Sequence, residues 1–379
     1  MKLYIHIPFC IRKCAYCDFL SAPADQDTIG QYMECLEKQL VMQAASFREK
    51  VVDTIFIGGG TPTILRIGQL EHLLAAVREH FSLTDDAEIT VEANPGTITA
   101  GKARALAEVG VNRVSLGLQS ASEQELRLLG RIHTYDDFLR SYGLVREAGI
   151  RNVNVDLMSA LPGQTITSYE KTLHQVLSLH PEHISAYSLI IEEGTPFYEQ
   201  YRADEKLRDA GEEPQILPSE ESERAMYELT GSLLAEYGYE RYEISNYAKE
   251  GYECRHNIGY WTGEEYLGLG LGTSSYIEET RFCNTSVLSE YLKEVFAPRE
   301  VQHLSKNERM AEFFYLGLRM TEGVAKADFV RRFGLSAETV YGDVLKDLIA
   351  QELLADTGTR YRLTPFGRDV SNQVLYRFL

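Results

Sequence analysis

The chain has 379 residues, 44% of them hydrophobic and 25% charged, a balance that is typical of a folded protein and excludes general disorder. At this length two or three domains are expected. The formal net charge of −18 disfavours a general nucleic-acid binder, because phosphate binding requires a basic surface.

The first predicted element is a strand at Leu3–Phe9. Residues 1–9 are largely apolar but are interrupted by His6 and Pro8, and the basic pair Arg12 and Lys13 follows them. This charge order is the reverse of that in a secretory signal. No apolar run in the chain reaches the roughly 18 residues that span a bilayer. We therefore expect a cytoplasmic protein.

Strands alternate with helices over the first 200 residues. Further segments rich in Val, Ile and Leu, as buried parallel strands are, follow the first: Thr54–Ile57, Glu88–Glu92, Arg113–Gln119, Asn152–Asp156 and His183–Ile191. Amphipathic segments separate them, such as 70–81, where apolar residues recur at helical spacing. The alternation predicts a parallel α/β sheet with right-handed crossovers, as an open sheet or a full or partial barrel.

Polar and glycine residues follow these strands where each one ends. Cys10 comes after the first strand and 58–62 (Gly-Gly-Gly-Thr-Pro) after the second, while Glu92, Gln119 and Asp156 end the third, fourth and fifth. Parallel sheets and α/β barrels carry their sites at the carboxyl ends of the strands. Five such endings in a row predict one shared site.

The second half of the chain is less regular. Residues 204–223 hold eight acidic and two basic residues with two prolines, which predicts a solvated loop. Residues 252–276 are rich in Tyr and Gly, which indicates close approach of the backbone to another group. From residue 304 onward the net charge is +1, against −19 before it, which favours a domain boundary near 300.

The end of the chain has helical periods from Asn307 and then two strand-like pieces, Leu353–Asp356 and Arg360–Leu363. Helices followed by such a hairpin resemble a winged helix. Its recognition helix would lie near Ala337–Leu348, which is acidic and therefore suits phosphate poorly. We expect a packing or docking role and no nucleic-acid partner. The predicted organisation is a barrel domain (1–200), an extension with the acidic loop (201–303) and a winged-helix-like C-terminal domain (304–379).

Three of the six cysteines, Cys10, Cys14 and Cys17, lie within eight residues at the spacing C-x3-C-x2-C. A structural zinc site takes four ligands, commonly from two Cys pairs, and no second pair exists. A thioredoxin-like pair would leave Cys10 unexplained. Three thiolates can hold three irons of a [4Fe–4S] cluster and leave the fourth open for the amino and carboxylate groups of S-adenosylmethionine (SAM). We therefore predict that these residues, the cysteine triad, bind such a cluster.

The triad after the first strand, followed by Gly-Gly-Gly-Thr-Pro after the second, resembles the radical SAM superfamily, which implies a partial (β/α)6 barrel. Within it the chain resembles the oxygen-independent coproporphyrinogen III oxidase family, which also includes haem chaperones. The resemblance runs over nearly the whole chain, through 3–10, 113–119, 129–133, 154–165 and 242–247. It implies that SAM contacts come from nine positions: Tyr4, Tyr16, Gly59, Gly60, Thr61, Glu92, Gln119, Arg131 and Asp156.

Three features distinguish the oxidases from the chaperones in this family. The oxidases carry a fourth cysteine two residues beyond the triad, where this chain has Phe19. They also carry an extension before the first strand, which we expect to be absent here. The chaperones carry a His-Asn-x-x-Tyr-Trp motif implicated in haem binding, which stands here at 256–261. All three features favour the chaperone.

The residues of this motif suit haem chemically. A neutral imidazole from His256 is a good axial ligand of haem iron, while Tyr260 and Trp261 can stack on a porphyrin. From the residues alone another interpretation remains open, in which His256 caps a turn while Tyr260 and Trp261 pack in a core. Cys254 is a lesser candidate, with a buried thiol as its ordinary role.

The resemblance therefore implies a haem chaperone that binds the cluster, SAM and haem, and that delivers haem to membrane respiratory haem proteins. A homodimer is a further expectation. The enzymatic alternative is radical decarboxylation of coproporphyrinogen III, in keeping with the retained SAM positions. A winged-helix regulator that uses the cluster as a redox sensor is a third class, which the acidic balance disfavours.

Overall fold

The computed structural model describes residues 1–379, apart from the side chain of Asp209. One curved sheet of twelve strands organises the first 303 residues, in the order β12-β11-β10-β9-β1-β2-β3-β4-β5-β6-β8-β7. Its centre is parallel and consists of β1 (Lys2–Ile7), β2 (Val51–Gly59), β3 (Ser82–Ala93), β4 (Arg113–Gln119), β5 (Asn152–Ser159) and β6 (His183–Ser188). All six predicted strands and the parallel α/β class are confirmed.

Short strands flank this centre on both sides. At one end β8 (Asn246–Ala248) pairs antiparallel with β6 and with β7 (Glu240–Arg241). At the other end β9 (Tyr266–Leu269) pairs parallel with β1, and three antiparallel strands follow: β10 (Ser274–Ile277), β11 (Thr280–Cys283) and β12 (Arg299–His303). The end strands β12 and β7 do not pair with each other, so the sheet is open.

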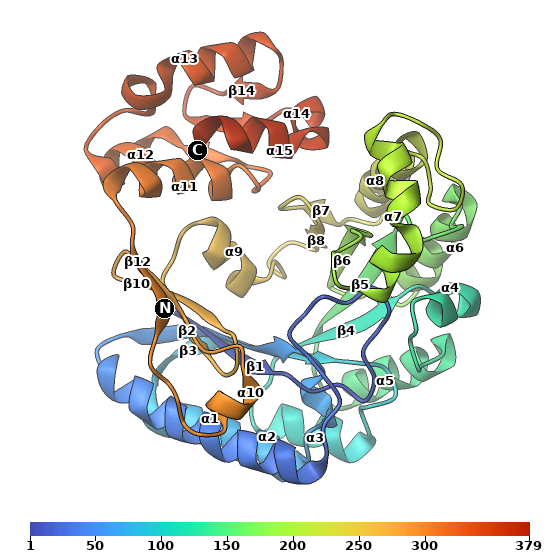
Figure 1. Cartoon of the computed structure of the whole chain (residues 1–379), viewed down its shortest axis with the longest axis vertical. Helices are drawn as coiled ribbons and strands as arrows, with labels where there is room; N and C mark the ends of the chain where they lie inside the picture. Colours follow the sequence, from blue (N-terminus) through green and yellow to red (C-terminus); the bar gives the residue numbers. More distant parts are fainter.

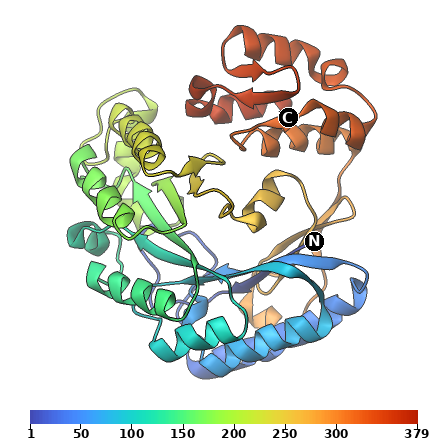
Figure 2. The ribbon, with the colours of Figure 1, turned by 180° about the vertical axis from the view of Figure 1, so that it is seen from behind.

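Helices α1 to α6 lie along the outer side of the sheet, and the two opposite views show the same layering (Figures 1 and 2). Their bounds are α1 Gln26–Ser46, α2 Ile67–His80, α3 Ala100–Glu108, α4 Glu123–Leu128, α5 Tyr135–Glu147 and α6 Ile166–Leu177, with a 3₁₀ turn at Pro62–Ile64. The helix predicted over 70–81 is confirmed as α2. Threonine side chains cap the N-termini of α3, α5 and α6 by accepting a backbone N–H, which fixes where each begins. Among the described residues no helix combines the length and apolarity needed to cross a membrane.

The prediction of a solvated loop over 204–223 is wrong for half of its length. Helix α7 (Pro196–Asp209) and helix α8 (Glu220–Glu236) cover both ends of this segment, which leaves only 210–219 as a connection. Thr195 caps α7 and Ser219 caps α8. Three acidic residues in the first turn of α8 favour the helix there, because carboxylates complement its positive N-terminal end. An acidic run is therefore compatible with a helix whose charged face is solvated.

Helix α9 (Arg255–Trp261) lies on the inner side of the sheet, facing the C-terminal part of the chain (Figure 1). The glycines of the Tyr- and Gly-rich segment approach the chain's own atoms. A Cβ at Gly268 would lie 2.4 Å from the Ser274 carbonyl oxygen, and one at Gly270 would lie 2.7 Å from the His6 carbonyl oxygen. These glycines therefore let β9 and the turn after it pack tightly against neighbouring backbone.

The chain from 304 onward has its own apolar core and a three-stranded sheet in the order β13-β15-β14. The Phe314 and Phe378 rings stack in that core with centroids 4.4 Å apart. The predicted hairpin is confirmed as β14 (Leu354–Asp356) and β15 (Arg360–Leu363). The other elements of this part are α11 Lys306–Gly317, β13 Val324–Ala325, α12 Lys326–Phe333, α13 Ala337–Ala350, α14 Pro365–Asp369, α15 Ser371–Leu375 and a 3₁₀ turn at Tyr376–Phe378. The short helix α10 (Leu288–Tyr291) lies earlier in the chain and precedes β12. The winged-helix assignment and the three domain boundaries remain predictions.

Candidate functional site

The cysteine triad lies on the loop after β1, and hydrogen bonds hold this loop at several points. The Cys10 N–H donates to the Ala22 carbonyl at 3.1 Å, and the Ala15 N–H donates to the Leu129 carbonyl at 3.0 Å. All three thiols are free of disulfides and partly exposed. Among the described residues no three His, Cys, Asp or Glu side chains gather as ligands of one ion. The cluster expected here does not require that, since each thiolate would hold a different iron.

Polar side chains from β2, β3 and the loop after α4 meet next to the triad. Thr61 Oγ1 lies 3.4 Å from Cys10 Sγ, and an Arg131 nitrogen lies 3.7 Å from Cys14 Sγ. Asn94 joins them, since it donates to Thr61 Oγ1 at 2.6 Å and accepts from Arg131 at 2.6 Å. Arg131 also donates to the Gly117 carbonyl, yet its buried Nε has no partner. This side of the site therefore retains an unused donor beside a thiol.

Gly59 is the last residue of β2 and Gly60 follows it, and neither position has room for a side chain. Gly59 has φ of +105°, and a Cβ there would lie 2.3 Å from the His6 ring. A Cβ at Gly60 would lie 2.5 Å from the Phe9 carbonyl oxygen. Backbone thus forms this wall of the site, as the resemblance to SAM-binding proteins implies. Gln119 at the end of β4 also has a left-handed φ, of +72°, a strain that is concentrated at functional sites.

Two buried carboxyl groups, Glu92 and Asp156, face a cavity of about 210 Å³ on the inner side of the sheet, which we call the lumen. Glu92 accepts from the Gly59 N–H at 2.9 Å, while Asp156 accepts from Asn154 at 2.7 Å and Ser115 at 3.1 Å. Burial, and then repulsion from Asp156, raises the pKa of Glu92 to about 7. Burial also raises the pKa of Asp156. The lumen is therefore suited to a ligand that brings positive charge.

Two of the predicted aromatic SAM contacts lie in different surroundings. Tyr4 lines the lumen and forms a 2.9 Å hydrogen bond with His6 Nδ1. Tyr16 lies on the triad loop with its ring 6.4 Å from that of Phe197. Tyr16 does not line the lumen, so these two rings approach the site from separate sides.

The donor set fits the cofactors that the sequence predicts. Three free thiols on one ordered loop match a cluster that leaves one iron open. SAM carries an ammonium, a sulfonium and a carboxylate. Glu92 and Asp156 complement its positive charges, and the unused Nε of Arg131 complements its carboxylate.

The side chain of His256 on α9 is almost fully enclosed, at 1% exposed. Its Nδ1 is hydrogen-bonded to Thr54 Oγ1 at 2.8 Å and its Nε2 to the Tyr260 hydroxyl at 2.9 Å. Burial lowers its pKa to about 3, so the imidazole is neutral. Both ring nitrogens are thus engaged, and iron ligation requires the Tyr260 hydroxyl to move away. The ring also packs 5.1 Å from that of Phe56, whereas the alternative interpretation expected it to cap a turn.

Helix α9 separates two cavities. The lumen lies on one side, and a larger cleft of about 770 Å³ lies on the other, between α9 and the C-terminal helices α11 and α12. His256 lines only the lumen and Trp261 only the cleft, whereas Tyr260 lines both. The predicted haem residues therefore face two cavities instead of forming one pocket.

Sequence reasoning missed several residues of this site. Asn94, two residues after Glu92, was not among the predicted site residues, although it connects Thr61 to Arg131. Arg113 lines the lumen, 2% exposed, with a buried Nε that has no partner. The sequence did contain a sign of this role, because Arg113 begins a largely apolar strand and a charge that is buried without a partner is costly. Cys254 is buried as expected, and burial raises the pKa of its thiol to about 12.

Comparison with known proteins agrees with this geometry. The model of the radical SAM superfamily matches residues 4–176, and that of the HemN C-terminal domain matches residues 304–370. The solved coproporphyrinogen III oxidase (HemN) from Escherichia coli, described as a radical SAM enzyme, has the same fold. Its TM-score is 0.84 at 24% identity, with 100% of this chain and 89% of that chain covered.

Curated relatives are similar over the full length. The haem chaperone HemW of Bacillus subtilis is 38% identical over 99% of this chain and 98% of its own. Those of Lactococcus lactis and Escherichia coli are 38% and 36% identical, over 99% and 100% of this chain and 96% and 98% of theirs. The radical SAM domain implies a [4Fe–4S] cluster and SAM. The chain belongs to the HemW family of radical SAM proteins.

Proposed function

We propose that this protein is a haem chaperone that receives haem beside α9 and delivers it to haem proteins of the respiratory membrane. The observation that carries the proposal is the motif at 256–261, in a chain 38% identical to a named haem chaperone over nearly its whole length. The placement of α9 supports it, because the motif residues Tyr260 and Trp261 line a cleft large enough for a ligand of this size. We place the function in the cytoplasm, with haem as cargo.

The cysteine triad would hold the cluster, and Glu92, Asp156, Arg131 and the Gly59–Gly60 backbone would hold SAM. When bound and reduced by an external one-electron donor, the cluster would supply one-electron reducing chemistry next to the SAM sulfonium. The protein's own contribution is to orient SAM between the two carboxylates and the guanidinium. All three of these side chains are partly buried.

Titration of reconstituted protein with haem, followed by visible absorption, tests the proposal. We expect one saturable complex in the wild type and weaker binding in His256→Ala, which removes the hydrogen bond that holds Tyr260 in the cleft wall. His183→Ala is the matched control, because His183 is also fully buried, with its ring nitrogens bonded to Asn154 at 2.6 Å and Tyr242 at 2.8 Å. The control should bind haem like the wild type. A wild type without a saturable complex would overturn the proposal.

The enzymatic alternative is oxidative decarboxylation of coproporphyrinogen III. The observation in its favour is that the chain retains all nine positions at which the resemblance implies SAM contacts. An anaerobic assay of the reconstituted protein with coproporphyrinogen III distinguishes the two. Formation of protoporphyrinogen would favour the enzyme, and its absence together with haem binding would favour the chaperone.

A further inference from the structure

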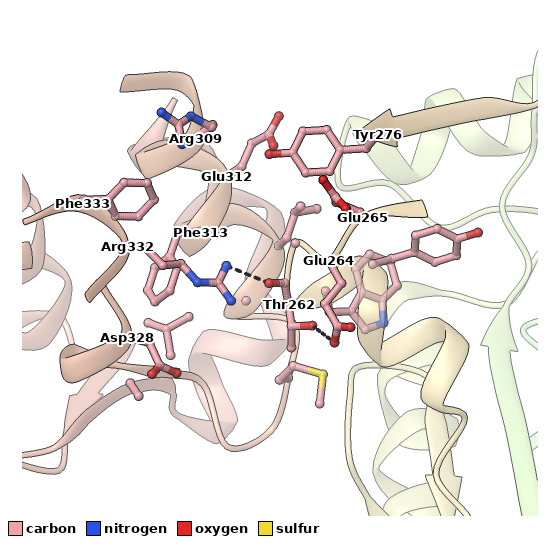
Figure 3. A pocket seen from close by; sticks show the side chains of 18 of the residues that line it. Thr262, Glu264, Glu265, Tyr276, Arg309, Glu312, Phe313, Asp328, Arg332 and Phe333 are labelled. Carbon is pink, nitrogen blue, oxygen red and sulfur yellow. Dashed lines mark hydrogen bonds between the residues drawn. The ribbon is translucent and has the colours of Figure 1, made fainter. Parts of the chain in front are cut away.

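The cleft between α9 and the C-terminal helices is lined by flat side chains. Trp261 contributes from α9, Tyr276 from β10, and Phe313 and Phe333 from α11 and α12. The buried Trp261 Nε1 has no hydrogen-bond partner. Figure 3 shows the Phe313 and Phe333 rings on one side of the cleft and Tyr276 on the other. A planar aromatic ligand suits such walls.

Charged side chains also line the cleft, and each of its carboxylates is ion-paired within the chain. Each carboxylate has an ion-pair partner at 4 Å or less: Glu264 with Lys2, Glu265 and Glu278 with Lys50, Glu279 with Arg309, Glu312 with Arg281, Glu322 with Arg360 and Asp328 with Arg331. Three of the four arginines that line the cleft are consumed by these pairs. Their charges are therefore not free to bind a ligand.

Arg332 is the exception among the arginines lining the cleft. Among the described residues no carboxylate pairs with it. Its guanidinium donates one hydrogen bond, to the Thr262 carbonyl at 2.9 Å, and lies 5.6 Å from the centroid of Phe313 (Figure 3). A guanidinium has five N–H donors in a fork that matches a carboxylate. Arg332 is exposed and still has most of those donors available.

The position of Arg332 connects this charge to the haem motif. Thr262 follows Trp261 and caps the C-terminus of α9, so the bond from Arg332 reaches the end of the motif helix. An unpaired guanidinium thus lies beside the aromatic walls, where a carboxylate on the edge of a planar ligand would meet it.

We propose that the cleft is the cargo site and that Arg332 binds a propionate carboxylate of haem. The inference rests on the proposed function and adds to it the site and the anionic anchor. Only one cleft arginine is unpaired, so one propionate is held there. The second faces the ion-paired carboxylates or solvent.

The test compares two probes, haem and its dimethyl ester, which lacks the propionate charges. The variants are Arg332→Gln and, as the matched control, Arg362→Gln, whose side chain is exposed, does not line the cleft and pairs with none of its carboxylates. We expect Arg332→Gln to weaken haem binding about 10-fold and to leave ester binding unchanged, since a charged hydrogen bond contributes about that much. Arg362→Gln should bind both probes like the wild type, and Arg332→Lys should recover part of the loss.

Equal weakening toward both probes would overturn the inference, because the effect would then be structural. Unchanged haem binding in Arg332→Gln would overturn it as well. Thermal unfolding of each variant identifies any loss of folding. If the wild type binds neither probe, the proposed function itself fails, which is a different result from a wild type that binds haem without help from Arg332.

Discussion

The buried carboxyl of Glu92 makes the stability of the cofactor-free protein dependent on pH. Burial and the nearby Asp156 raise its pKa from 4.5 to about 7, against a smaller opposing effect of the Gly59 N–H. The folded state therefore holds the proton more tightly than the unfolded state. The contribution of Glu92 to the free energy of unfolding is fully present below about pH 4.5, and it is lost as the pH rises through about 7.

The size of this effect follows from the two pKa values. The difference corresponds to roughly 3 kcal/mol of unfolding free energy, most of which is lost between about pH 5 and pH 8. Glu92→Gln removes the titration but keeps an amide oxygen that can accept from the Gly59 N–H. As the pH rises over this range, we expect the free energy of unfolding of the variant to increase by about 2 to 3 kcal/mol relative to that of the wild type.

Urea unfolding of the cluster-free, SAM-free protein under reducing conditions, repeated from pH 5 to pH 8, measures this difference. Asp156→Asn removes the charge that repels the Glu92 carboxylate. The free energy of unfolding of this variant should therefore also depend less on pH. Parallel wild-type and Glu92→Gln curves across this range would refute the reasoning, since the carboxyl would then have the same pKa folded and unfolded.

Three further predictions concern other parts of the chain. Replacing any residue of the cysteine triad by Ala should abolish the bound iron of reconstituted protein, while Cys283→Ala should keep it; iron and sulfide analysis measures both. Tyr260→Phe should weaken haem binding by up to about fivefold in a spectral titration, because it removes the hydrogen bond of about 1 kcal/mol to His256 that holds this ring in the cleft wall; equal or tighter binding would contradict this. Phe314→Ala should destabilise the C-terminal domain by about 3 to 5 kcal/mol in denaturant unfolding, because its buried ring stacks on Phe378; a loss under 1 kcal/mol would show that this core is not tightly packed.

Periodic and repeated features of the sequence predicted the centre of the fold. The strand at Arg113–Gln119 has the same bounds in the structure, and the polar strand endings do gather around one site. These predictions succeed because a buried parallel strand is apolar throughout and ends at the same edge as its neighbours. The prediction of a loop for the acidic segment 204–223 failed at the two helices, because charge alone does not distinguish a solvated loop from the solvated face of a helix such as α8.

Contacts between distant segments were out of reach. Strand β9 pairs with β1 across more than 250 residues, and four residues carry too little pattern to predict that neighbour. The engagement of both His256 nitrogens depends on Thr54 as well as on the adjacent Tyr260. The unpaired state of Arg332 is equally non-local, since it depends on which carboxylates the other arginines occupy. Such facts follow from tertiary structure and have no local signature.

Tyr260 forms part of the wall of both the lumen and the cleft. A ligand that moves this ring on one side therefore alters the cavity on the other. Thermodynamics then requires the coupling to be symmetric: the factor by which SAM changes the affinity for haem equals the factor by which haem changes the affinity for SAM. With one aromatic ring in the wall of both, the two cavities are linked in binding free energy through that shared contact.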